Sequence, residues 1–203
     1  MNKNFLLCVI FFSSCAQLTI QDYQNVANLI FQENEQLKIN SEYIENKNFS
    51  FAKINIGNKN SAILSLATVE NDIFTWISAN GEKLITRNGR IIESYGLDYD
   101  FSTLNSTEFQ LEPSSYELIV QLENPRAIIT QNNTINFAGD KLLFLDKQYQ
   151  TGLFIENFLS NSINWKGKNY FWIDKSTGLA LRTHQHVHPY EKSIELEFYY
   201  IFR

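Results

Sequence analysis

The stretch DIFTWISANGEKLITRNGRIIESY, residues 72–95, decides the fold of this chain. It holds three runs rich in aromatic and β-branched residues, separated by the dipeptides Asn80-Gly81 and Asn88-Gly89. Asn-Gly is typical of type I′ turns, which join antiparallel strands in tight hairpins. The stretch therefore predicts a three-stranded antiparallel meander in which both turns are of type I′.

Runs of the same character continue on both sides of the meander. The last run places Ile194, Leu196 and Phe198 on one face of a strand, since alternate side chains point the same way. A flat sheet of this many strands would leave exposed edges. We therefore predict one mainly β domain, a twisted antiparallel sheet curled into a barrel or half-barrel, with loops over 98–114 and 132–140. The predicted strands are 49–56, 61–69, 72–79, 82–87, 90–95, 115–122, 126–131, 141–146, 168–173, 179–187 and 193–202.

One N-terminal helix is predicted ahead of the strands. Its apolar residues recur at i, i+3, i+4 and i+7, the stripe of an amphipathic helix. Thr19 and Asp22 have the spacing of a capping box at its start. The polar residues 32–48 are predicted to be a connection. The residues of the stripe are Tyr23, Val26, Ala27 and Ile30.

The N-terminus has the layout of an export signal. Lys3 supplies a positive charge, residues 5–12 form a short apolar run, and Ser13-Ser14-Cys15 follows as a small-small-Cys cleavage site. An ordinary signal peptide or a buried N-terminal strand is the alternative. We predict a lipoprotein signal over 1–14, an anchor, helix and connection over 15–48, and a β-rich periplasmic domain over 49–203.

The predicted role of Cys15 is lipid attachment. Its thiol would form a thioether with diacylglycerol, and its amine would be acylated after cleavage. Several acyl chains give the stable membrane anchoring that one chain cannot. Ala16 follows Cys15, where an Asp would signal retention in the inner membrane. This favours the periplasmic face of the outer membrane.

Composition limits the chemistry of the folded domain. The net charge is −5, with no basic tract, so nucleic acid is not an expected partner. Both cysteines, Cys8 and Cys15, precede the domain, which excludes disulfides and Cys-based sites within it. A Gly-x-Ser-x-Gly elbow and Gly-rich phosphate loops are absent from the sequence. We therefore expect neither catalysis nor a cofactor.

All three histidines lie in one short segment, at His184, His186 and His188. Residues two apart on a strand face the same way about 7 Å apart, so two of these imidazoles could reach one metal ion. The alternative, which we favour, is a polar row near a strand end that binds no metal. No second cluster of ligands is evident in the sequence.

Several segments along nearly the whole chain follow the pattern of one known family. They are residues 76–80, 84–92, 96–97 and 136–139, and a closing hairpin made by 171–174 with Thr177, Gly178 and Arg182. With the lipoprotein signal, this pattern resembles the YjbF/GfcB family of group 4 capsule and exopolysaccharide lipoproteins of Gram-negative bacteria. The closing hairpin alone is also similar to one in periplasmic half-barrel carriers and sensors of the LolA and RseB type.

The resemblance implies a non-catalytic accessory factor in capsule or exopolysaccharide assembly or export, which would bind the polymer or the export proteins. The alternative is a half-barrel carrier that binds lipid or lipoprotein in an apolar cavity. We predict that the hairpin around Asn88-Gly89 contacts the polysaccharide or a partner protein. The prediction rests on the motif resemblance and on an expected exposed turn, whose arginines would form a small basic spot. The candidate contact residues are Trp76, Thr86, Arg87, Asn88, Gly89 and Arg90.

Replacing Cys15 tests the anchor. We expect Cys15→Ala, or treatment with globomycin, to leave an unprocessed or soluble chain, because the modified thiol carries the lipid and the cleavage follows its modification. Membrane fractionation with mass spectrometry measures this. A mature mass unchanged from the untreated wild type would contradict the lipoprotein prediction.

Overall fold

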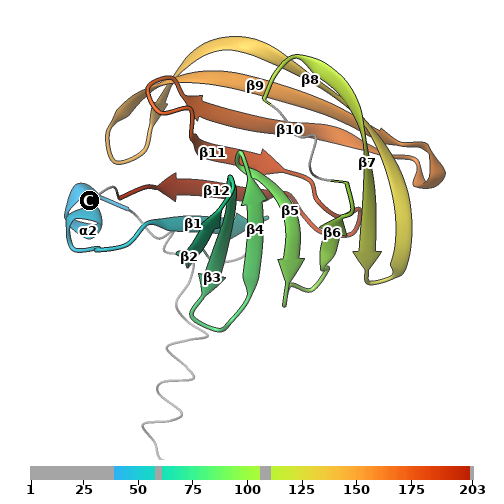
Figure 1. Cartoon of the computed structure of the whole chain (residues 1–203), viewed down its shortest axis with the longest axis horizontal. Coiled ribbons are helices and arrows are strands. Elements are labelled where there is room, and N and C mark those ends of the chain that lie inside the picture. The colour runs from blue at the N-terminus through green and yellow to red at the C-terminus, as the bar shows by residue number, and fades with distance from the viewer. Residues whose placement is uncertain (1–38, 58–60, 106–110, 202–203) are drawn as a thin grey trace, which may run out of the picture. The chain divides into compact units, whose positions relative to one another are not determined.

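A computed structural model describes residues 39–57, 61–105 and 111–201, which all belong to one compact unit, Gln36–Arg203. Cys15, the signal segment and the helix predicted from Thr19 to Ile30 lie outside the described residues. Within the described part, the strands form a closed antiparallel barrel (Figure 1). This confirms the predicted mainly β fold and selects the barrel over the half-barrel.

The barrel follows the order of the chain. Each strand pairs with the next one, and β1 pairs with both β2 and β12, which closes the sheet. The described helices and strands are α2 (Ser41–Glu45), β1 (Phe51–Ile56), β2 (Ala62–Glu70), β3 (Ile73–Ser78), β4 (Lys83–Arg87), β5 (Arg90–Tyr95), β6 (Phe101–Thr103), β7 (Ser114–Glu123), β8 (Arg126–Phe144), β9 (Gln148–Ser160), η2 (Asn161–Ile163), β10 (Trp165–Asp174), β11 (Ala180–Gln185) and β12 (Ile194–Tyr199).

The short helix α2 lies in the segment predicted to be a connection. The Asn40 side chain caps it by accepting a hydrogen bond from the Tyr43 backbone N–H at 2.8 Å. The Tyr43 ring packs edge-on against Phe51 of β1, with 5.6 Å between ring centroids. A cap and one aromatic contact therefore order one turn within a polar stretch that carries no helical periodicity.

The predicted meander is confirmed, with β3, β4 and β5 paired in antiparallel register. At the second turn Asn88 and Gly89 have φ values of 50° and 81°, as a type I′ turn requires. The prediction for the first turn is wrong. A type I′ turn needs a positive φ at both central residues, and here Gly81 has one but Asn80 does not. Ser78 there accepts from the Gly81 N–H at 3.2 Å, which fits a longer loop with a glycine bulge.

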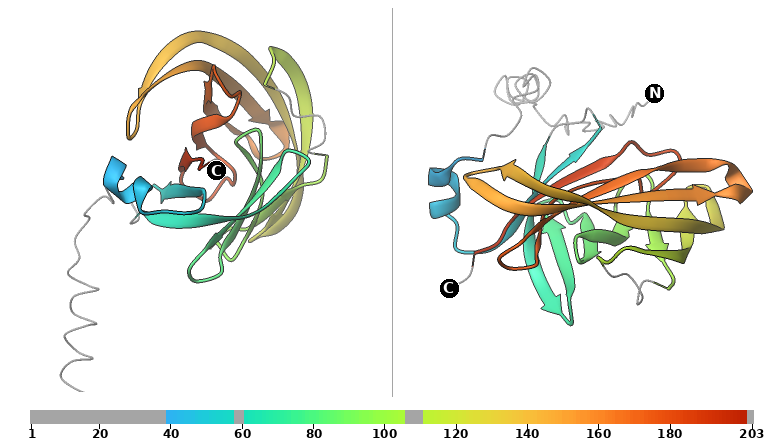
Figure 2. Two further views of the ribbon diagram at one scale, coloured as in Figure 1. Left: turned by 60° about the vertical axis from the view of Figure 1, so that its left-hand side comes forward. Right: turned by 90° about the horizontal axis from the view of Figure 1, so that it is seen from above.

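The long hairpin β8–β9 departs most from the sequence prediction. We predicted strands over 126–131 and 141–146 with a loop between them, but the structure has one strand, Arg126–Phe144. Its partner β9 was missed entirely. A register shift between Phe137 and Gly139 lets β8 continue through its Asn- and Gly-containing middle. Figure 2 shows this hairpin, in yellow and orange, curving along its length. The short β6 likewise lies in a predicted loop.

The apolar face of β12 is buried in the core, as predicted. Ile194, Leu196 and Phe198 are each at most 1% exposed. Phe198 packs against Trp76 of β3, with 5.2 Å between ring centroids. The fully buried Trp76 donates its Nε1–H to Thr86 Oγ1 at 2.9 Å, so its one polar atom is satisfied inside the core.

The turn between β4 and β5 lies inside the fold against β11 (Figure 1). The buried Gln185 side chain holds it by donating to the Gly89 carbonyl at 2.8 Å and accepting from the Ile91 N–H at 3.0 Å. A Cβ atom added to Gly89 would lie 2.4 Å from the Ala180 Cβ. Only glycine therefore fits this position, for both its positive φ and its close contact.

Substituting Gly89 tests this packing. We expect Gly89→Ala to lower the free energy of unfolding by about 2–4 kcal/mol, because it adds a steric overlap to the strain of a positive φ. Gly81→Ala is the matched control: its φ is 95° but a Cβ there meets nothing within 4 Å. It should cost about 1 kcal/mol, from strain alone. Urea denaturation measures both, and equal losses would contradict the close contact.

Candidate functional site

The hairpin residues proposed as a contact site are largely buried. Trp76 is 0%, Thr86 1% and Arg90 5% exposed. Gly89 is buried against β11, while Arg87 and Asn88 are half-buried. The Arg87 Nε lies 3.4 Å from Asp72 Oδ2. The expected exposed turn with a basic spot is therefore wrong, since the arginines pair with acidic residues of the chain.

Arg90 instead belongs to a buried polar network across the interior. It forms an ion pair with Glu156 of β9, which is 0% exposed. The Tyr116 hydroxyl lies 2.9 Å from the Arg90 Nη2 and also donates to Glu156. Asn169 of β10 donates to the other Glu156 oxygen at 2.6 Å. One carboxylate thereby connects β5, β7, β9 and β10.

The pKa values in this network follow from its burial. Burial alone would lower the pKa of Arg90, but the Glu156 carboxylate outweighs it and holds that pKa above its usual value. Burial also raises the pKa of Tyr116, and the charge of Glu156 adds to the effect. Arg90 thus stays cationic and Tyr116 stays a hydrogen-bond donor. With both Glu156 oxygens occupied, the arrangement acts as a structural link.

The three histidines do not converge on one point. His184 of β11 stacks on Tyr170, and its ring centroid lies 5.6 Å from that of His186. His188 is 1% exposed and stacks on Tyr99. Burial lowers the pKa of both His186 and His188, so both favour the neutral form. Among the described residues, no group of three or more His, Cys, Asp or Glu side chains is placed to hold a metal ion.

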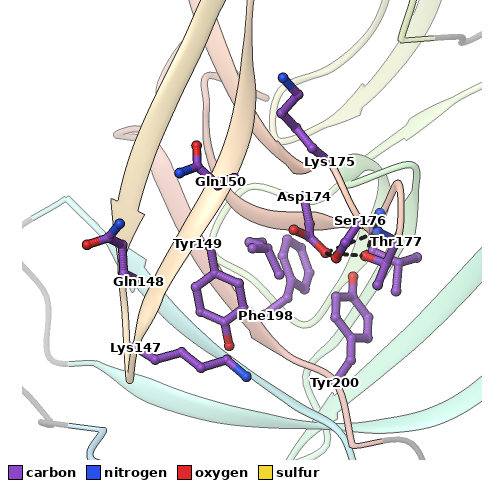
Figure 3. A pocket seen from close by; sticks show the side chains of 12 residues that line it. Lys147, Gln148, Tyr149, Gln150, Asp174, Lys175, Ser176, Thr177, Phe198 and Tyr200 are labelled. Carbon is purple, nitrogen blue, oxygen red and sulfur yellow. Dashed lines mark hydrogen bonds between the residues drawn. The ribbon is translucent and has the colours of Figure 1, made fainter.

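The candidate site is a pocket of about 620 Å³ that the sequence did not reveal (Figure 3). It lies where the start of β9, the β10–β11 turn and the end of β12 meet. Its lining combines apolar and aromatic side chains with amides, hydroxyls, one carboxylate and two amines. The lining residues are Lys147, Gln148, Tyr149, Gln150, Asp174, Lys175, Ser176, Thr177, Leu179, Leu181, Phe198 and Tyr200.

The β10–β11 turn holds the Asp174 carboxylate of the pocket in place. Its Oδ2 accepts hydrogen bonds from the Ser176 hydroxyl at 2.5 Å, the Thr177 hydroxyl at 2.7 Å and the Thr177 N–H at 3.1 Å (Figure 3). Burial alone would raise the pKa of Asp174, but these hydrogen bonds outweigh it and lower the pKa. The pocket therefore holds an ionised carboxylate whose orientation the turn determines.

Aromatic side chains form another part of the lining. Phe198 is buried, and Tyr149 and Tyr200 lie to either side of it in the view of Figure 3. The Tyr149 hydroxyl donates to Asp146 at 3.0 Å, which fixes the ring. Burial raises the pKa of Tyr149 and of Tyr200, so both stay protonated at neutral pH.

The sequence contained one signal for this pocket. The closing-hairpin motif included Asp174 and Thr177, whose side chains here form the β10–β11 turn. Three further lining residues, Gln148, Tyr149 and Gln150, belong to β9, the strand that was not predicted. Only the pairing of β9 with β8 and β10 brings them to the turn.

Comparison with known proteins gives one family match. A family model described as "Group 4 capsule polysaccharide lipoprotein gfcB, YjbF" matches residues 24–199. No curated protein matches the chain in sequence.

Two solved structures are similar to the chain. The hypothetical lipoprotein YmcC from Escherichia coli (K12) has a TM-score of 0.72 and 18% sequence identity, over 93% of this chain and 99% of that one. At this identity the likeness shows a shared fold. A putative lipoprotein from Parabacteroides distasonis has a TM-score of 0.36 and 13% identity, over 75% of this chain and 96% of that one. It is too distant to bear on the fold.

No helix in the described residues is long and apolar enough to span a membrane.

Removing Arg90 tests the interior network. We expect Arg90→Met to lower the free energy of unfolding by about 3–5 kcal/mol, because it leaves the Glu156 carboxylate buried without its cation. Arg182→Met is the control, since its ion pair with Glu195 at 2.7 Å is about one third exposed. We expect that variant to lose about 1 kcal/mol or less. Similar losses in urea denaturation would contradict the role of the buried pair.

Proposed function

Because the chain belongs to the family of group 4 capsule polysaccharide lipoproteins GfcB and YjbF, we propose that it is an accessory factor in capsule or exopolysaccharide assembly or export. The observation that carries this proposal is the family match, which includes every strand of the described barrel. Its expected partners are the polysaccharide itself or the proteins that export it. Nucleic acid stays outside the proposal because the chain is acidic.

The proposed location is the periplasmic face of the outer membrane, with the chain anchored through acyl chains on Cys15. The export signal ending at Ser13-Ser14-Cys15 supports the anchor, and Ala16 supports the outer membrane. The family's description as lipoproteins agrees with this.

The proposed role is non-catalytic. The most buried carboxylate, Glu156, is occupied by Arg90, Tyr116 and Asn169. Asp174 has its pKa lowered, whereas a general acid at neutral pH needs a raised one. These two observations favour binding or assembly over bond cleavage.

A lipid carrier of the LolA and RseB type is the less favoured function. Such a carrier needs a roomy apolar cavity. The interior here is filled by core side chains such as Trp76 and is crossed by the charged Arg90–Glu156 pair. An acyl chain placed there would have to displace both.

Deletion of the gene tests the proposed function. We expect surface polysaccharide to fall and the sorting of other lipoproteins to stay normal, because the chain serves polymer assembly and not lipoprotein transport. Quantification of extracted capsule, with fractionation of a reference lipoprotein, measures both. Complementation with the wild-type gene is the control.

The reverse result would contradict this function. Normal capsule with mislocalised lipoproteins would favour the carrier, and normal capsule with normal sorting would remove the polysaccharide role altogether.

A further inference from the structure

We propose that the pocket between β9, the β10–β11 turn and β12 binds a saccharide unit of the capsule polymer, with Asp174 accepting hydrogen bonds from its hydroxyl groups. This inference rests on the proposed function and assigns the polymer contact to one site. Its volume of about 620 Å³ lies within the range of about 300–1,000 Å³ typical of ligand pockets. A short segment of a glycan fits a space of this size.

The carboxylate provides the polar contact. All three hydrogen bonds that Asp174 receives from side chains and backbone N–H groups of the turn go to Oδ2. Asp174 is 7% exposed and lines the pocket. Hydrogen bonds to an ionised acceptor are stronger than those between neutral groups. An ionised and oriented oxygen suits the hydroxyl groups that a sugar presents.

The aromatic side chains provide the apolar contact. A pyranose ring has apolar C–H faces between its hydroxyl-bearing edges, so it needs an apolar surface beside polar groups. Tyr149, Phe198 and Tyr200 line the pocket together with Asp174 (Figure 3). The amides of Gln148 and Gln150 point away from these rings, because successive residues of a strand face opposite sides of the sheet (Figure 3). The lining therefore offers both kinds of surface within one sugar's reach.

Charges of both signs lie at the rim of the pocket. Lys147 and Lys175 are exposed, but Lys175 pairs with Asp140 at 2.7 Å, and Asp146 accepts from the Tyr149 hydroxyl. Because Asp174 is a third carboxylate here, the rim has no excess of positive charge, and a neutral glycan suits it better than an acidic one.

A peptide is the other class of partner that a surface pocket can bind. Peptides often add a strand to an open sheet edge. Residues 136–144 of β8 pair with β9 alone and leave such an edge, but none of them lines the pocket. The polar lining of the pocket itself favours a saccharide.

Calorimetry with a defined probe tests the pocket. The probe is capsular polysaccharide purified from the strain that encodes the chain, with oligosaccharides released from it by partial acid hydrolysis. The full chain, purified in detergent, should bind both. We expect Tyr149→Ala, and separately Asp174→Asn, to weaken binding about tenfold, equivalent to the loss of one or two good contacts. The urea midpoint of each variant is measured beside its affinity, so that a loss of folding is not taken for a loss of binding.

The matched control is Asn157→Ala. Asn157 is another exposed amide of β9 and lies outside the pocket. We expect it to bind as the wild type does. The double variant Gln148→Ala with Gln150→Ala is a second control, because both side chains are exposed and point away from the rings, and it should change neither binding nor the urea midpoint.

Three outcomes would overturn the inference. They are a wild-type chain that binds neither probe, pocket variants that bind as tightly as the wild type, and pocket variants that lose only a protein partner while still binding the glycan. In a deletion strain, the Tyr149→Ala variant should fail to restore capsule. Full restoration by it would overturn the pocket and leave the proposed function intact, whereas a deletion without any capsule defect would overturn the function itself.

Discussion

The buried ion pair between Arg90 and Glu156 is the interaction on which the rest of the barrel depends. Removing two charges from water is costly, and further hydrogen bonds are needed to offset that cost. Tyr116 and Asn169 supply two of them by donating to the two Glu156 oxygens. Four strands must therefore keep these groups within hydrogen-bonding distance. The turn before Arg90 is held against β11 by Gln185, so this end of the β4–β5 hairpin fills the interior.

The pocket lies beside the core of the barrel. Core side chains and the Arg90–Glu156 pair occupy space that a lipid carrier would keep open, whereas the pocket at the β10–β11 turn offers a place for a ligand. Its turn is rigid, since Asp174 is held by Ser176 and Thr177. The pocket can therefore hold its carboxylate in one orientation. Such a site suits a protein that binds a polymer and holds it without changing its covalent structure.

Local patterns predicted the meander and the last strand, whereas features that depend on contacts between distant residues were not predicted. The alternation of apolar residues correctly predicted the buried face of β12, and the Asn88-Gly89 dipeptide correctly predicted one type I′ turn. Both features depend on only a few neighbouring residues. The burial of Arg90 depends on Glu156, which lies 66 residues further along the chain in a strand that was not recognised. The middle of β8 seemed a loop because its Asn and Gly residues are typical of loops, but pairing with β9 and the shift at Gly139 keep it extended. The pocket was missed for the same reason.

A double-mutant cycle on Arg90 and Glu156 tests the central claim most directly. The three variants Arg90→Met, Glu156→Met and the double replacement would be compared by urea denaturation. If the two side chains pair inside the barrel, each single variant leaves one buried charge without its partner. The double variant is then more stable than either single variant. The predicted coupling energy is above about 2 kcal/mol. Additive losses, with a coupling energy below about 0.5 kcal/mol, would contradict the account.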